Sequence, residues 1–306
     1  MQLFFHMNTY YSNGKLLITG EYAVLDGALA LALPTKFGQN LQVSELDVPS
    51  IIWESFSVEK TLWFQTEFQI SELGVLNADK RVATLQNILV EAQKLNPNFL
   101  NDGKGAFVQT FLSFPNDWGL GTSSTLINNI AQWANVDAFQ LLHNSFGGSG
   151  YDIACAQNNT PILYQNKNSK PLIQASNFLP DFTDALFFVH LNKKQDSKEG
   201  IQLYRSIDED KKEFVDQISE LTAQILGAPN LLIFEKLLEA HEHLVGEFLN
   251  IVPLKQSLFT DYFGAIKSLG AWGGDFILVT GNEQTPAYFN ERGYETVLTY
   301  KEMILA

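Results

Sequence analysis

The feature that most constrains this chain is a glycine turn that leads directly into a segment with helical periodicity. The turn reads Asp117-Trp118-Gly119-Leu120-Gly121-Thr122-Ser123-Ser124-Thr125. Apolar residues then recur on one face of a predicted buried helix, at Leu126, Ile127, Ile130, Ala131 and Ala134. A helix that opens at a glycine turn leaves backbone N–H groups unpaired, with the positive end of the helix dipole behind them. The stretch therefore predicts an anion site, and a phosphate is its natural ligand.

The turn does not belong to either of the common phosphate-loop patterns. No Gly-Lys-Ser/Thr sequence closes it, as a Walker A loop requires, and it is not Gly-x-Gly-x-x-Gly. The alternative is an ordinary capped helix after a turn, because serine and threonine are common N-caps. On this stretch alone, both interpretations stay open.

Length and charge restrict the class of protein. The chain has 306 residues, which is enough for one large or two ordinary domains, each with its own core. Asp and Glu number 34 against 20 Lys and Arg, so the net charge is −14. Because no basic groove is visible, we expect no nucleic-acid partner, and an anionic ligand would need local donors.

Cysteine content and hydropathy indicate the compartment. Cys155 is the only cysteine, which excludes an intrachain disulfide and suits a reducing environment. Residues 1–11 lack the positive n-region of a signal peptide. No apolar run reaches the roughly 18 residues of a membrane span. We therefore expect a cytoplasmic protein that does not act at a membrane.

Periodicity predicts an α+β chain in two domains. The first hundred residues are mostly β, a helix is predicted over 82–95, and a strand over 106–114 leads into the glycine turn. The polar run 165–170 is the best boundary, so the predicted domains are 1–168 and 169–306. In the second, we expect a strand over 185–191, a polar loop over 192–200, and three helices, around 209–226, 229–249 and 254–269.

Three glycine-rich turns occur in a characteristic order, at residues 14–27, 119–125 and 270–275. The first reads Gly-Lys-Leu-Leu-Ile-Thr-Gly-Glu-Tyr-Ala-Val-Leu-Asp-Gly and the third Gly-Ala-Trp-Gly-Gly-Asp. In this order the chain resembles the GHMP kinases, which include galactokinases and homoserine, mevalonate and phosphomevalonate kinases. The resemblance spans residues 14–280, and the first and third turns look most like those of mevalonate and phosphomevalonate kinases.

The resemblance implies a fold as well as an activity. It implies an N-terminal GHMP-kinase ATP-binding domain with a mixed sheet and helices on one side, ribosomal protein S5 domain 2-like. It also implies a C-terminal GHMP-kinase domain with a ferredoxin-like α/β layer. The implied activity is ATP-dependent phosphoryl transfer to a small anionic metabolite, with ATP and Mg²⁺ as cofactors.

The family's site residues carry over by position in the motifs. The second turn would bind the ATP phosphates, through Gly119, Leu120, Gly121, Thr122, Ser123, Ser124 and Thr125. Ser123 matches the serine that ligates Mg²⁺. Asp152 matches the aspartate that faces the acceptor, and Lys15 matches the lysine beside it. The implied substrate-binding residues are Glu21, Ser149, Gly150, Tyr151, Gly273 and Gly274.

Lys15 and Asp152 make a chemically sensible pair. An ionised carboxylate orients a hydroxyl and takes its proton, while an ammonium group neutralises charge on the moving phosphoryl group. The alternatives are an Asx turn or helix cap for Asp152 and a surface position at a strand end for Lys15.

One departure from the family pattern concerns the metal. The second Mg²⁺ ligand in mevalonate kinases is a glutamate, and its position here is Leu141. Mg²⁺ prefers hard oxygen ligands, usually carboxylates. Three hypotheses therefore remain: a mevalonate kinase, a phosphomevalonate kinase, and a nucleotide-binding relative that has lost catalysis. The expected partners are ATP, a small-molecule substrate and, in addition, a second copy of the chain in a homodimer.

Overall fold

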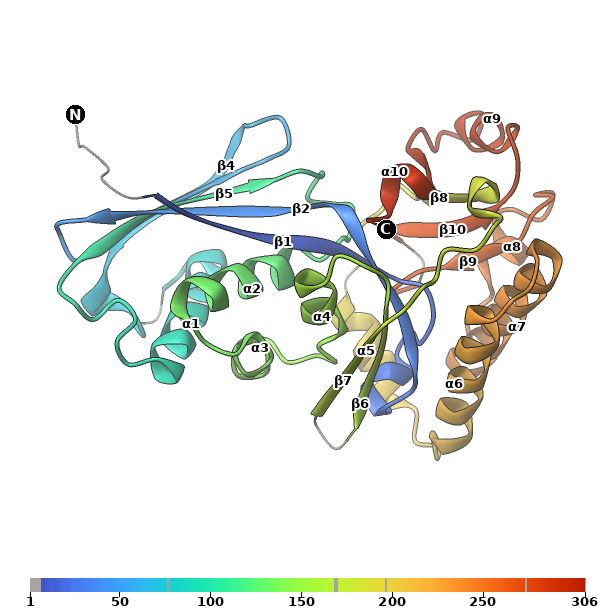
Figure 1. Ribbon diagram of the computed structural model, residues 1–306, viewed down its shortest axis with the longest axis horizontal. Helices are drawn as coiled ribbons and strands as arrows, with labels where there is room; N and C mark the ends of the chain where they lie inside the picture. Colours follow the sequence, from blue (N-terminus) through green and yellow to red (C-terminus); the bar gives the residue numbers. More distant parts are fainter. Residues whose placement is uncertain (1–6, 76, 168–169, 196, 273, 306) are drawn as a thin grey trace. The chain divides into compact units, whose positions relative to one another are not determined.

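The computed structural model describes residues 7–75, 77–167, 170–195, 197–272 and 274–305. It contains a mixed sheet covered by helices and a second, small antiparallel sheet (Figure 1). The α+β class predicted from the sequence is confirmed.

The described residues form two compact units that interleave along the chain. Unit 1 draws on Met1–Gly14, Phe37–Asn116 and Leu120–Gln157. Unit 2 draws on Lys15–Lys36, Asp117–Gly119 and Asn158–Ala306. The boundary predicted between residues 168 and 169 stays a prediction, because it concerns family domains rather than these units.

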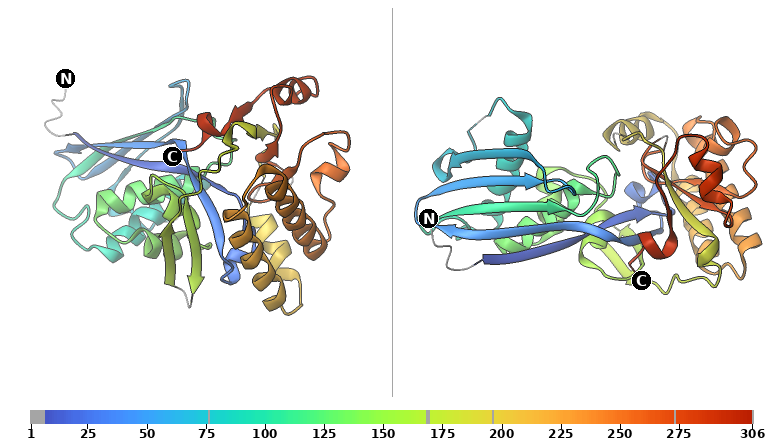
Figure 2. Two further views of the ribbon diagram at one scale, coloured as in Figure 1. Left: turned by 45° about the vertical axis from the view of Figure 1, so that its right-hand side comes forward. Right: turned by 90° about the horizontal axis from the view of Figure 1, so that it is seen from above.

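Unit 1 is a twisted sheet with helices on one face, and its strands run side by side when seen from above (Figure 2). Strand order is β4-β3-β5-β2, with β3 and β5 parallel and the other pairs antiparallel. The strands are β1 (Met7–Leu17) as far as Gly14, β2 (Ala30–Leu46) from Phe37 onward, β3 (Ser50–Phe56), β4 (Leu62–Gln69) and β5 (Gly105–Leu112). The helices are η2 (Ile70–Glu72), α1 (Lys80–Leu95), α2 (Thr122–Ala134), α3 (Ala138–Ser145) and α4 (Tyr151–Gln157).

The core of unit 1 follows the sequence periodicity. Trp53 and Val108 from the sheet pack with Leu89 of α1, Ile130 of α2 and Leu141 of α3, all fully or almost fully buried. Helix α1 begins where the Asp79 side chain accepts from the Arg81 N–H and ends at Leu95, the end of the predicted helix, shortly before Pro97. This packing fixes the start of α2, where the glycine turn lies.

Unit 2 contains the antiparallel sheet, in the order β11-β8-β10-β9, and a β-hairpin that extends the start of β2. The strands are β6 (Ile162–Lys167), β7 (Lys170–Ala175), β8 (Leu186–His190), β9 (Ile266–Ser268), β10 (Phe276–Thr280) and β11 (Val297–Thr299). The helices are η1 (Ala23–Asp26), η3 (Thr183–Ala185), α5 (Ser197–Ser206), α6 (Lys212–Leu226), α7 (Leu231–Leu249), α8 (Leu254–Ser257), α9 (Thr285–Asn290) and α10 (Tyr300–Met303). Among the described helices, none is long and apolar enough to cross a membrane.

Two local predictions in unit 2 are wrong. The helix expected over 254–269 stops after one turn, at Ser257, and the chain then forms β9, in which Lys267 pairs with Leu278 of β10. Pairing with β10 supplies the backbone hydrogen bonds that a longer helix would have made, and short apolar runs do not distinguish strand from helix. Helix α5 also begins inside the polar loop expected over 192–200.

Candidate active site

Helix α2 presents backbone donors at its N-terminus in unit 1. Gly121 is the N-cap, with φ 92° and ψ 40°, a left-handed conformation that favours glycine. The first hydrogen bond of the helix runs from the Thr125 N–H to the Gly121 carbonyl, at 2.9 Å. By helix geometry, the N–H groups of Thr122, Ser123 and Ser124 have no acceptor inside α2. They form the donor set that the sequence predicts for an anion.

Thr125 and Leu120, two residues of the predicted phosphate loop, help to hold the loop in place. The Thr125 N–H is already bonded within the helix, and its hydroxyl lies 2.8 Å from Gln39 Oε1 and 3.0 Å from the Thr122 carbonyl oxygen. Leu120 is fully buried. The phosphate role expected for Thr125 therefore conflicts with the structure, and the Leu120 side chain anchors the turn.

Asp152 lies beside the start of α2. The Ser124 hydroxyl donates to Asp152 Oδ2 at 2.7 Å. Asp152 is in the first turn of α4, and the Gln157 amide donates to Asn128 of α2 at 2.9 Å, which also joins the two helices. The predicted acceptor-facing carboxylate and the predicted phosphate donors are thus brought together in unit 1, although they are about thirty residues apart in sequence.

The segment before Asp152 turns through left-handed glycines. Gly150 has φ 88° and is buried, while Ser149 and Tyr151 on either side are half-buried. This turn places Asp152 at the start of α4. The substrate contacts expected of Ser149, Gly150 and Tyr151 stay predictions.

The position of the missing glutamate is part of the core. Leu141 is fully buried in the core of unit 1 and offers no metal ligand. Among the described residues, no group of three or more His, Cys, Asp and Glu side chains is arranged to hold a metal. The hard oxygen atoms near the α2 N-terminus include the exposed Ser123 hydroxyl and the Asp152 carboxylate. This set fits a Mg²⁺ ion that arrives on a nucleotide better than one held by protein carboxylates.

Unit 2 holds Lys15 and the first part of the glycine turn. The Lys15 ammonium donates to the Gly119 carbonyl at 3.0 Å. Gly119 has φ +65°, and a Cβ at this position would overlap the Asp275 carboxylate. The Lys15 side chain therefore contacts the glycine turn. Its pairing with Asp152, which belongs to unit 1, stays a prediction.

Asp275 is a candidate site residue that the sequence interpretation did not select. Burial raises its pKa, and the nearby charge of Lys15, the Gln195 N–H, and the charges of His190 and Lys194 oppose that shift. The available signal was an acidic residue closing the third glycine turn. Of the two glycines predicted to bind substrate there, Gly273 lies outside the described residues. A Cβ on Gly274 would lie 2.7 Å from the Lys193 carbonyl oxygen, so tight packing explains this glycine.

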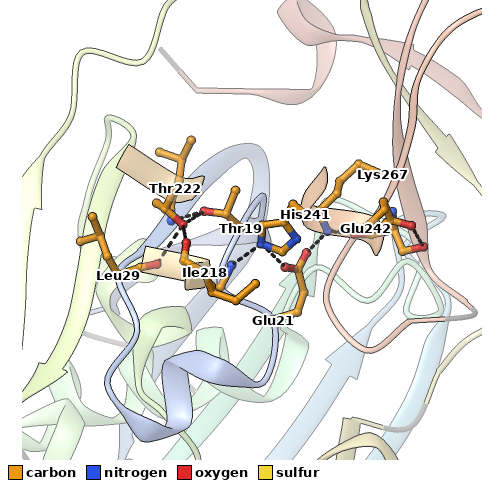
Figure 3. A network of polar contacts seen from close by, with 11 residues as sticks. Thr19, Glu21, Leu29, Ile218, Thr222, His241, Glu242 and Lys267 are labelled. Atoms are coloured by element: carbon orange, nitrogen blue, oxygen red, sulfur yellow. Dashed lines mark hydrogen bonds and ion pairs between the residues drawn. The ribbon is translucent and has the colours of Figure 1, made fainter. Parts of the chain in front are cut away.

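Glu21 occupies a buried network of charges in unit 2 (Figure 3). Its side chain is fully buried, and Oε1 accepts from the Lys267 ammonium at 2.5 Å. Glu21 Oε2 lies 3.4 Å from His241 Nε2, which accepts from the Gly20 N–H at 3.3 Å. Lys267 also lies 3.3 Å from Glu242 Oε1. The substrate contact expected of Glu21 conflicts with this placement, because no surface of the side chain is left for a ligand.

Burial shifts the titration of the network. It raises the pKa of Glu21 to about 7 against the opposing effect of Lys267. It also raises the pKa of Glu242 and, with the Lys267 charge, lowers that of His241 well below its ordinary value. Two buried carboxylates share one lysine, so a proton on Glu21 leaves the cluster neutral. Sequence reasoning missed Lys267 and Glu242, whose only signal is a charge within an apolar segment.

Comparisons with known proteins give a structural likeness. No family model and no curated protein sequence matches the chain. The solved mevalonate kinase of Methanococcus jannaschii is 16% identical, with 99% of each chain covered and a TM-score of 0.73. Streptococcus pneumoniae phosphomevalonate kinase in complex with phosphomevalonate and AMPPNP is 18% identical, with 93% of this chain and 95% of that chain covered and a TM-score of 0.68. Lactococcus lactis galactokinase complexed with galactose is 12% identical, covering 99% and 94%, with a TM-score of 0.68. The chain therefore has the fold of the GHMP kinases.

Proposed function

We propose that this chain is an ATP-dependent kinase of the GHMP type that phosphorylates a hydroxyl group of a small anionic metabolite, mevalonate in the first instance. The observation that carries the proposal is the hydrogen bond from Ser124 to Asp152. It holds a carboxylate next to the N–H groups at the start of α2 that have no acceptor inside the helix, and this combination of acceptor and donors is what phosphoryl transfer to a hydroxyl needs. The fold likeness supports the same class of reaction.

The start of α2 fits a nucleotide phosphate. The N–H groups of Thr122, Ser123 and Ser124 would bind its oxygens, after Gly121 begins the helix in a left-handed conformation. When bound, ATP would supply the phosphoryl group, and Mg²⁺ would neutralise part of the negative charge on that group. The Ser123 hydroxyl is the protein oxygen best placed to join the metal's ligands, because Ser124 already donates to Asp152.

Asp152 is the proposed base. Ser124 occupies Oδ2, so the Oδ1 atom can accept a hydrogen bond from the substrate hydroxyl. As the hydroxyl oxygen bonds to phosphorus and the bond to the ADP oxygen breaks, the hydroxyl proton passes to Asp152 and then to solvent. Lys15, fixed on the Gly119 carbonyl, would stabilise the negative charge on the transferring group.

An ADP-release screen tests the proposal. Mevalonate, phosphomevalonate, homoserine and galactose are each supplied with ATP and Mg²⁺, and ADP is measured. We expect release with mevalonate that depends on Asp152. Release with phosphomevalonate alone would move the assignment to the phosphomevalonate kinase alternative.

The second candidate is a nucleotide-binding protein without catalysis. It is favoured by Leu141, which places a core side chain where a metal ligand is expected. ATP would then raise the melting temperature, as any ligand of the native state does, without ADP release from any acceptor. The expected homodimer and cytoplasmic location stay predictions.

A further inference from the structure

We propose, on the basis of the kinase function proposed above, that Asp275 is a positioning residue that acts through Gly119 on Lys15. Its carboxylate packs against the glycine whose carbonyl accepts from the Lys15 ammonium. Asp275 would not touch the reacting atoms. It would set where Lys15 stands when the phosphoryl group is transferred.

The contact between Asp275 and Gly119 leaves no spare room. A Cβ on Gly119 would overlap the carboxyl carbon and both oxygens of Asp275. Gly119 also has φ +65°, a conformation that side-chain-bearing residues rarely adopt. Glycine is thus required for two separate reasons, and only the steric one depends on Asp275.

The backbone of Asp275 is itself held firmly. Its N–H donates to the Lys193 carbonyl at 2.6 Å, and its carbonyl accepts from the Leu191 N–H at 2.8 Å. The Gln195 N–H donates to Oδ1 at 3.3 Å. Asp275 has φ +54°, which is uncommon for a residue other than glycine. Three hydrogen bonds from one segment therefore keep this aspartate in an unfavourable backbone conformation that aims its carboxylate at Gly119.

The residues before Gly119 are also held within unit 2. His190 Nε2 lies 3.2 Å from the Asp117 carbonyl oxygen. The Trp118 ring meets Phe276 edge-on, with ring centroids 5.4 Å apart. The start of the glycine turn thus rests on the ends of β8 and β10, and a small movement of Asp275 would be transmitted directly to Gly119.

The charges around Asp275 favour positioning over metal binding. The Lys15 and Lys194 ammonium groups and the His190 imidazole all act on this carboxylate. A carboxylate surrounded by such groups is a poor ligand for a divalent cation, because the cation would be repelled by the same neighbours. The Asp275 carboxylate attracts the Lys15 ammonium, which donates to the carbonyl of the neighbouring Gly119.

The kinetic test uses Asp275→Asn, which keeps the shape of the side chain and removes its charge. A misplaced Lys15 should lower kcat by about 10–100-fold, because a misplacement of roughly 1 Å can have an effect of this size. The KM for ATP should stay within about threefold, since the proposed phosphate donors belong to α2. The matched control is Asp181→Asn, an exposed aspartate of unit 2 that should leave both constants unchanged.

A stability cycle tests the contact independently of catalysis. Gly119→Ala is introduced into the wild type and into Asp275→Ala, and the melting temperature of each variant is measured. Gly119→Ala should lower the melting temperature more in the wild-type background, because only there does the new Cβ meet a carboxylate. An equal decrease in melting temperature in the two backgrounds would show that Asp275 does not contact Gly119.

The two measurements separate the possible failures. An unchanged kcat for Asp275→Asn in an active enzyme would overturn the positioning role, even if the stability cycle shows coupling. A lower melting temperature with unchanged kcat of the folded fraction would make Asp275 structural. A wild-type chain without phosphoryl transfer to any acceptor would overturn the proposed function and the positioning role together, and the cycle would still decide the contact.

Discussion

Replacing Glu21 with glutamine should change how the stability of unit 2 depends on pH. Glu21 is fully buried between Lys267 and His241, with Glu242 on the other side of Lys267. Glutamine has nearly the same shape as the protonated carboxyl group but cannot ionise. The substitution therefore removes one titration and leaves Lys267, Glu242 and His241 in place.

The size of the effect follows from the shift of the Glu21 pKa from 4.5 to about 7. Between these values the native state keeps a proton that the unfolded state has lost, so the free energy of unfolding falls as the pH rises. One pKa unit corresponds to about 1.4 kcal/mol, so the wild type should lose roughly 2–3 kcal/mol relative to Glu21→Gln between about pH 5 and pH 8. His241, whose lowered pKa acts in the opposite direction below about pH 6.5, is common to both proteins and cancels to first order.

Hydrogen exchange of the α7 amides is the suitable assay. Because the chain has two units, a single unfolding free energy for the whole molecule is not assured, whereas α7 reports on unit 2 alone. Exchange is measured at each pH for both proteins, corrected for the intrinsic exchange rate and converted to an opening free energy. The change in opening free energy with pH is compared between the two proteins. A loss of hydrogen bonding that lowers the stability of the variant equally at every pH therefore does not affect the comparison.

A control in the same helix identifies the cause. Glu239 of α7 is an exposed carboxylate paired with Lys255 at 3.0 Å, and Glu239→Gln should change the pH dependence by less than about 0.5 kcal/mol. If Glu21→Gln shows the same pH dependence as the wild type, the buried carboxyl group titrates alike in the folded and unfolded states. The account of the network as a proton-holding cluster would then be wrong.

Three further predictions concern the network and the proposed site. Lys267→Met leaves two buried carboxylates without their cation, and hydrogen exchange of the α7 amides should show that the opening free energy falls by about 3–5 kcal/mol; a fall below about 1 kcal/mol would contradict the pairing. Gly121→Val places a branched side chain at φ 92° and should abolish the rise in melting temperature caused by ATP, so a surviving shift would mean that the turn is only a helix cap. Asp152→Asn should lower kcat by a factor on the order of 10²–10⁴ with mevalonate while calorimetry shows unchanged ATP affinity, and an undiminished kcat would remove Asp152 from the mechanism.

Local sequence patterns were sufficient for much of the fold and for one part of the site. The helical spacing of residues 82–95 and the apolar strand 185–191 became α1 and β8, because short-range periodicity determines which face of an element is buried. A helix begins directly after the Gly119–Gly121 turn, and its first N–H groups have no acceptor inside it, since glycine conformation and helix geometry are both local properties. The order of the three glycine turns indicated the GHMP-kinase fold.

The tertiary structure determined the burial and the partners of individual polar side chains. Glu21 looked like a substrate ligand in its motif, but its partners His241 and Lys267 come from α7 and β9, more than 200 residues away. Thr125 was expected to bind phosphate, but its hydroxyl donates a hydrogen bond to Gln39 of β2. Residues 266–268 were expected to be helical, but they form a strand because they pair with β10. The role proposed for Asp275 depends on its contact with Gly119, which is more than 150 residues away in sequence. In each case a partner distant in sequence determined the burial and charge of the group, and no local pattern records which partner will be near.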